Sequence, residues 1–160
     1  MSTDLMEVIN RLKNNIEVVP KNNLSFTEDE LAMKPEPSKW SKKEILGHLV
    51  DSAANNHARF VKAQFQNEPF NMEGYAQNEW VDVQKYNDKE TNSLVELWKV
   101  YNEHILYIME NTPDEQLKIK CIAEDAFENA DTLFLLMKDY VDHMDHHLNQ
   151  IFINISWSLK

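Results

Sequence analysis

The chain has 160 residues, of which 42% are hydrophobic, and its 16 Lys and Arg against 27 Asp and Glu give a formal net charge of −11. This length suits one domain with a sizeable hydrophobic core, and we expect residues 1–160 to form a single domain. The acidic balance argues against binding to nucleic acid, which needs a concentrated Lys and Arg surface, and against docking on anionic lipid.

The scarcity of glycine and cysteine excludes further classes of protein. Gly47 and Gly74 cannot form a Gly-x-Gly-x-x-Gly turn or a Walker loop, so the common phosphate-binding loops are absent. Cys121, the single cysteine, excludes an intrachain disulfide framework and every Cys-x-x-Cys motif. The N-terminal residues are untypical of a signal peptide, and no apolar stretch is long enough to span a bilayer. We therefore expect a cytoplasmic protein.

Apolar residues recur at the three- and four-residue steps of an amphipathic helix in four segments. The expected helices cover residues 3–19, 41–66, 90–111 and about 129 or 131 to 155. Pro20 and the pair Asn22 and Asn23 are expected to end the first, and Ser41 with Glu44 forms a capping box that opens the second. A short helical turn is expected near residue 27, and residues 69–87 should form a structured loop. The pattern predicts an all-α protein, a four-helix bundle.

Three histidines lie on or beside the core-facing arcs of these helices. On a helical wheel His143 and His147 fall at the edge of the buried arc of the last helix, whereas His146 falls toward its polar flank. His48 lies at the margin of the buried arc of the second helix. A polar seam continues from it along the same helix: Ser52, Asn55 and Arg59.

Two inward histidines four residues apart and a third on another helix are typical of a divalent-metal site. Neutral imidazole binds zinc, nickel, copper or iron, and the i, i+4 spacing directs two rings to one point. Three protein ligands leave a coordination position open for water or substrate, as in catalytic sites. On spacing alone, satisfied core histidines remain an equal alternative. A ferritin-like di-iron centre is excluded, because no histidine has an acidic residue three positions before it.

Two motifs resemble a known family. Residues 40–60 (WSKKEILGHLVDSAANNHARF) resemble the first metal-ligand helix of DinB-like proteins, particularly the YfiT-type branch, and residues 140–151 (YVDHMDHHLNQI) resemble that family's closing motif. Residues 75–80 (YAQNEW) match a loop commonly found between them. The resemblance implies a four-helix bundle, often a homodimer, with nickel or zinc on three histidines. These ligands carry over to His48, His143 and His147.

The resemblance also implies a choice of chemistries. The family contains thiol-dependent transferases of the bacillithiol and mycothiol type, so our first expectation is an S-transferase whose metal holds a low-molecular-weight thiol as thiolate. A metal-dependent hydrolase that uses a metal-bound hydroxide is the second. Independently of the resemblance, the competing class is a non-enzymatic, stress-related binding module whose histidines are structural.

Four polar residues are candidates for the surroundings of the metal. Arg59 and Asn55 could hold an anionic group of a small-molecule substrate, although a salt bridge from Arg59 to a neighbouring acid is an equal alternative. Ser52 belongs to the same seam, and Gln150 stands where the YfiT-type pattern often has a further histidine.

The remaining reactive and aromatic side chains receive weaker expectations. We expect Cys121 to be an incidental thiol rather than a nucleophile. His57 and His104 are expected at the surface or in packing. Three aromatic residues are candidates for the pocket wall or, more simply, for the core: Trp80, Trp98 and Tyr101.

Overall fold

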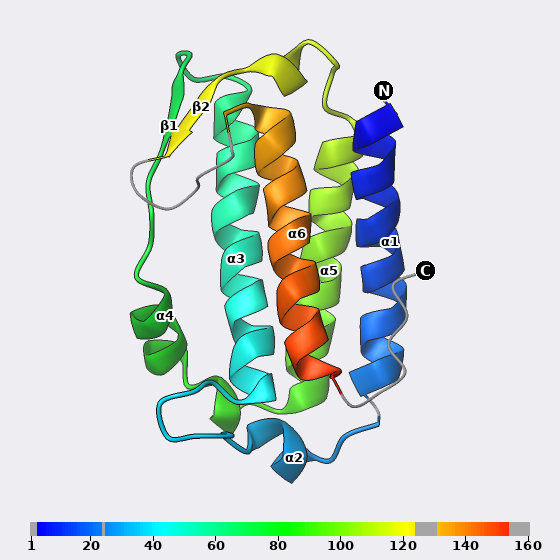
Figure 1. Cartoon of the computed structure of the whole chain (residues 1–160), viewed down its shortest axis with the longest axis vertical. Coiled ribbons are helices and arrows are strands. Elements are labelled where there is room, and N and C mark those ends of the chain that lie inside the picture. Colours follow the sequence, from blue (N-terminus) through cyan, green and yellow to red (C-terminus); the bar gives the residue numbers. More distant parts are fainter. Residues whose placement is uncertain (1–2, 24, 124–130, 154–160) are drawn as a thin grey trace.

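The structure, a computed structural model, describes residues 3–23, 25–123 and 131–153. Within these residues four long helices lie side by side along the molecule (Figure 1): α1 (Thr3–Asn23), α3 (Lys42–Ala63), α5 (Thr91–Glu110) and α6 (Leu133–Ile151). Helices α1 and α3 each pack against both α5 and α6. The expectation of an all-α four-helix bundle is confirmed.

Capping side chains mark the residues at which α3 and α6 begin. Ser41 Oγ accepts a hydrogen bond from the backbone N–H of Glu44 at 3.0 Å, and Glu44 Oε2 accepts one from the N–H of Ser41 at 2.8 Å. This is the capping box expected from the sequence, and α3 follows it directly. Helix α6 begins after Thr132, whose hydroxyl accepts from the N–H of Leu135. Residues 129 and 130, where α6 was expected to start, and residues 154 and 155 at its expected end lie outside the described residues.

The prediction that the first helix stops near Val19 is wrong, because α1 continues through Pro20 and ends only at Asn23. Proline removes one backbone donor and crowds the preceding turn, so it disfavours a helix interior. Val19 and Asn23 are nevertheless buried, 1% and 5% exposed, and hold this last turn against the rest of the protein. Packing of the terminal turn therefore outweighs the local cost of the proline.

The expected loop at residues 69–87 contains regular structure that the sequence did not reveal. Strand β1 (Phe70–Met72) pairs in parallel with β2 (Cys121–Ala123), with Phe70 opposite Cys121. Helix α4 (Gln77–Gln84) follows and lies beside α3 (Figure 1). The smaller elements are α2 (Glu28–Ala32) and two single-turn 3₁₀ helices, η1 (Tyr86–Asp88) and η2 (Gln116–Lys118).

Polar contacts join α6 to the helices on either side of it. Arg11 of α1 donates to Asp142 at 2.7 Å and, through Nε, to Asp145 at 3.1 Å. Asn15 of α1 donates to the other oxygen of Asp145 at 2.6 Å. The buried hydroxyl of Tyr140 donates to Asn102 of α5 at 2.6 Å. These bonds link helices whose apolar faces alone would tolerate some rotation.

Gly47 allows η1 to lie directly on α3. A Cβ added at Gly47 would overlap the Tyr86 ring, with Cε2 only 2.6 Å away. We expect Gly47→Ala to lower the free energy of unfolding by about 1–3 kcal/mol, since the ring must move away. Urea denaturation measures the change. Gly74→Ala is the matched control, because an added Cβ there meets nothing within 4 Å. Equal stability of the Gly47→Ala and wild-type proteins would contradict this account.

Candidate functional site

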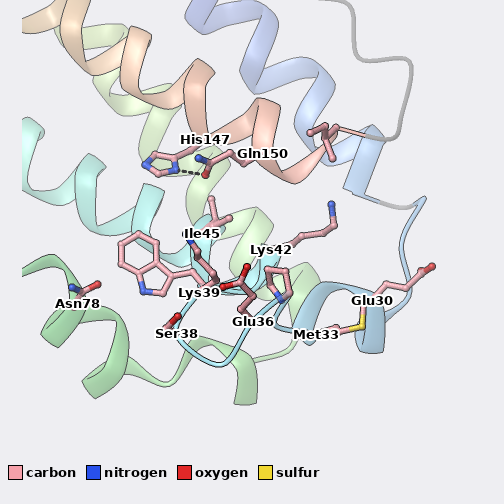
Figure 2. A pocket seen from close by; sticks show the side chains of 13 residues that line it. Glu30, Met33, Glu36, Ser38, Lys39, Lys42, Ile45, Asn78, His147 and Gln150 are labelled. Atoms are coloured by element: carbon pink, nitrogen blue, oxygen red, sulfur yellow. Dashed lines mark hydrogen bonds between the residues drawn. The ribbon is translucent and has the colours of Figure 1, made fainter.

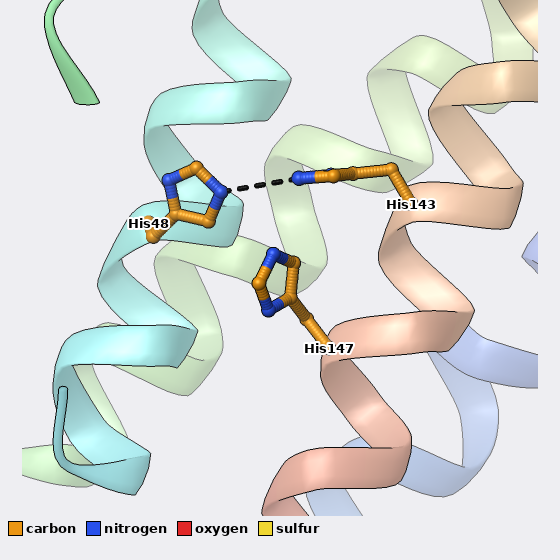
Figure 3. A group of neighbouring side chains, drawn as sticks. All are labelled: His48, His143 and His147. Atoms are coloured by element: carbon orange, nitrogen blue, oxygen red, sulfur yellow. Dashed lines mark hydrogen bonds between the residues drawn. The ribbon is translucent and has the colours of Figure 1, made fainter. Parts of the chain in front are cut away.

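His48, His143 and His147 converge between α3 and α6 (Figure 3), and each offers a ring nitrogen such that these atoms all lie within 4.8 Å of one another. His48 Nε2 lies 3.2 Å from His143 Nε2. The ring of His147 has its centroid 4.9 Å from that of His48 and 4.6 Å from that of His143. The structure thus brings together the three histidines singled out from helical spacing.

The geometry and chemistry of these three side chains fit a divalent transition metal. Two imidazole nitrogens bound to one ion at about 2.0–2.1 Å lie about 3.0–3.4 Å apart, depending on the coordination geometry. The separation of 3.2 Å between the Nε2 atoms of His48 and His143 falls in this range. Among the described residues the group contains histidines alone, without a carboxylate or thiolate. A neutral nitrogen donor set suits zinc, nickel, copper or iron.

Burial keeps the three imidazoles uncharged. Burial first, and the neighbouring histidine rings second, lower the pKa of His48 to about 4 and that of His143 to about 3. The pKa of His147 is also lowered, mainly by burial. Metal binding requires neutral imidazole, because a protonated ring has no lone pair to donate. At neutral pH all three side chains are in the form that a metal needs.

A cavity of about 620 Å³ opens beside His147. Figure 2 shows His147 and Gln150 of α6 on one side of it, with Ser38 and Asn78 from the segment before α3 and from α4 on the other. Its apolar wall consists of Met33, Pro35, Trp40, Ile45 and Ile153. The cavity therefore gives a small molecule a route to one face of the histidine group.

Gln150 orients the ring of His147. Its Oε1 lies 3.0 Å from His147 Nδ1, and its Nε2 lies 3.0 Å from His146 Nε2. Because the amide oxygen can only accept, this bond places the proton of His147 on Nδ1 and leaves Nε2 with its lone pair. Gln150, expected near the metal, thus contacts one of the three histidines.

The polar seam on α3 leads away from the histidines. Arg59 lies 11 residues beyond His48 in sequence, which is about 16 Å along a helix. It donates to the backbone carbonyl of Glu73 at 2.6 Å and lines a separate cavity of about 270 Å³ together with Asn55. Ser52 is buried one turn after His48 and accepts from Asn56 at 3.3 Å. A substrate would have to bridge two cavities to contact both Arg59 and the histidines.

The aromatic candidates fall in different environments. Trp98 is fully buried in the core, Trp80 is 39% exposed, and neither is among the residues that line the cavity beside His147. Tyr101 of α5 contacts His57 of α3 instead, and both side chains are half-buried. An aromatic residue outside these expectations, Trp40, contacts the histidine group instead, with its ring centroid 4.8 Å from that of His48. Its position directly before the capping serine was the available signal.

Cys121 has the properties of an unreactive thiol. It is buried in β2, 3% exposed, and burial raises its pKa to about 11. A thiol with so high a pKa contributes almost no thiolate at neutral pH.

In the part of the chain that the structure covers, none of the helices combines the length and the apolar character needed to cross a bilayer.

The stability of the metal-free protein should fall as the pH is lowered from about 6.5 toward 4. The unfolded chain protonates His48 and His143 near pH 6.5, whereas the folded chain does so only near pH 4 and 3. Each of these two histidines should therefore lower the free energy of unfolding by about 1.4 kcal/mol for every pH unit by which the pH falls across this interval.

Urea unfolding in the presence of a chelator, at about pH 7 and about pH 5, measures this dependence. The double variant His48→Gln, His143→Gln should show a shallower slope, while His146→Gln, at an exposed position, should match the wild type. Equal slopes in the wild type and the double variant would contradict the assignment of buried, neutral histidines.

The chain is similar to known proteins in both sequence and fold. The model of the DinB superfamily matches residues 22–151. The solved structure of YfiT from Bacillus subtilis, described as a probable metal-dependent hydrolase with an unusual four-helix bundle topology, is similar with a TM-score of 0.82 and 18% sequence identity. This similarity covers 99% of the present chain and 91% of that one. A search of curated proteins found no match. With the family match over most of its length, the chain belongs to the DinB superfamily.

Proposed function

We propose that the chain is a metal-dependent enzyme that binds one divalent ion, nickel or zinc, through His48, His143 and His147. The observation that carries this proposal is the convergence of three uncharged imidazoles, from two helices, within 4.8 Å of one another. Bound by three protein ligands, such an ion supplies Lewis acidity and an open position for a substrate atom. The description of YfiT as a probable metal-dependent hydrolase agrees with this class of function.

The cavity beside His147 supplies the substrate site of this proposal. A volume of about 620 Å³ is in the range of small-molecule pockets. The side chains of Trp40, Ile45 and Met33 can contact an apolar part of the substrate and exclude water from it. Asn78 and Gln150 offer amide groups that can orient a polar part.

S-transfer from a low-molecular-weight thiol is the reaction that we propose first. Cys121 cannot supply the sulfur nucleophile, since it is buried in β2 with a pKa near 11. The nucleophile would then enter as a second small molecule, for which the cavity has room. Its sulfur would form a bond to an electrophilic carbon, the leaving group would depart with the bonding electrons, and the thiol proton would pass to solvent.

Hydrolysis is the second candidate, favoured by the description of YfiT. A non-enzymatic, stress-related binding module is the outcome that remains if the metal-loaded protein turns over no substrate.

We also propose a homodimer, because α5 exposes Leu97, Val100 and Tyr107 by 43%, 52% and 64%, and exposed apolar patches often mark protein contacts. Light scattering should give twice the chain mass, and a monomer would contradict the dimer.

Metal content tests the ligand assignment. Protein purified without a histidine tag or added metal should contain about one divalent ion per chain, measured by inductively coupled plasma mass spectrometry. His143→Gln and His147→Gln should each remove most of it, because two remaining ligands bind weakly. His146→Ala should retain the ion.

A second histidine pair provides a matched control for that experiment. The rings of His57 and His104 lie 4.9 Å apart on α3 and α5, away from the candidate metal centre. The variant His57→Gln, His104→Gln should leave the metal content unchanged. Unaltered metal content in His143→Gln would remove the proposed site.

A panel of small electrophiles and esters, with and without a small thiol, tests the reaction class. The metal-loaded wild type should form thioether or thioester products only when the thiol is present, and His143→Gln should lose at least about 100-fold in rate. Mass spectrometry identifies the product. Ester cleavage that does not depend on the thiol would contradict S-transfer and favour hydrolysis.

A further inference from the structure

His48 has one ring nitrogen that the histidine group does not use. Figure 3 shows its Nε2 directed toward His143, while its second nitrogen, Nδ1, lies on the opposite side of the ring. The side chain is 0% exposed, and Nδ1 has no hydrogen-bond partner among the described residues. A histidine that binds a metal almost always donates its other N–H to a carboxylate, a carbonyl or water. His147 has such a partner in Gln150, whereas His48 does not.

One carboxylate oxygen of Asp51 is likewise buried without a hydrogen-bond partner among the described residues. This oxygen is Oδ2, and the residue is 2% exposed. Asp51 follows His48 by three positions in α3, so both side chains emerge from the same face of the helix. Helical side chains lean toward the N-terminus, which inclines the Asp51 carboxyl group toward the preceding turn, where His48 lies. A potential donor and a potential acceptor, both buried, are thus left on adjacent turns.

The other oxygen of Asp51 is held in place. Oδ1 accepts hydrogen bonds from the Tyr86 hydroxyl at 2.6 Å and from Gln84 Nε2 at 2.6 Å. Tyr86 reaches this position because Gly47, the residue before His48, has no side chain in the space that the tyrosine ring occupies. These two bonds orient the carboxyl group, so only Oδ2 remains for a further partner.

We propose that Asp51 is the positioning residue of His48, accepting the Nδ1–H through Oδ2 across one buried water, since the two atoms make no direct hydrogen bond. This bond holds His48 in the tautomer whose Nε2 lone pair faces His143 and His147. In the metal-free protein that lone pair can accept the Nε2–H of His143, in agreement with their separation of 3.2 Å. The inference rests on the proposed metal function for its purpose, but the tautomer itself does not depend on a bound ion.

The variant Asp51→Asn tests the proposal, because it preserves the shape of the side chain. Its amide oxygen can still accept from Tyr86, which leaves the NH₂ group facing His48 and unable to accept a proton. In nitrogen-15 NMR of the metal-free wild type we expect His48 as the Nδ1–H tautomer, and in Asp51→Asn as the Nε2–H tautomer. The affinity for Zn²⁺, measured by competition with a chelator, should fall about 10- to 100-fold.

Asn102→Ala serves as the control for a general loss of stability. It removes a buried hydrogen bond to Tyr140 on a helix that carries no ligand, so the His48 tautomer and the Zn²⁺ affinity should stay as in the wild type. An unchanged tautomer in Asp51→Asn would overturn the proposal, even if affinity fell, since the effect would then be merely structural. If the wild type bound no Zn²⁺, the proposed metal function would fail, and the tautomers would still decide the role of Asp51.

Discussion

The rotation of α6 about its own axis is the constraint on which the candidate metal centre depends. Asp145 lies two residues from both His143 and His147, so it projects from nearly the opposite side of the helix. Arg11 and Asn15 of α1 hold that carboxylate, and the pairing turns the two histidines toward α3. A hydrogen bond on one side of α6 therefore positions the imidazoles on the other side.

The centre places uncharged polar groups where charge would be costly. Three rings between two helices cannot all be protonated, because each is partly or fully removed from water and each would repel the others. The same burial keeps their lone pairs available and limits access to the cavity side. A metal ion would offset the energetic cost of gathering polar nitrogens in the core. The arrangement that destabilises the metal-free protein is thus the one that the proposed function requires.

The segment between α3 and α5 contributes more to the site than its loop-like sequence suggests. Helix α4 supplies Gln84 to Asp51 and Asn78 to the cavity, and η1 supplies Tyr86. Strand β1 connects this segment to β2, which lies about fifty residues later in the chain. The segment thus lies against α3 and holds the polar groups close to His48, although it contributes none of the three histidines.

Local patterns in the sequence were enough to predict the bundle, the capping box at Ser41 and the inward position of three histidines, because helical periodicity decides which side chains share a face. These patterns could not predict that α1 continues past Pro20, that β1 pairs with β2, or that Trp40 lies against His48. Each of these depends on contacts between segments distant in the chain, whose energy is absent from any local window. Spacing likewise placed Arg59 on the same seam as His48, but only packing decided that Arg59 lines a separate cavity whereas His48 is fully buried beside His147. The sequence therefore determined which residues face inward, and the tertiary structure decided which of them meet and which ring nitrogen each histidine presents.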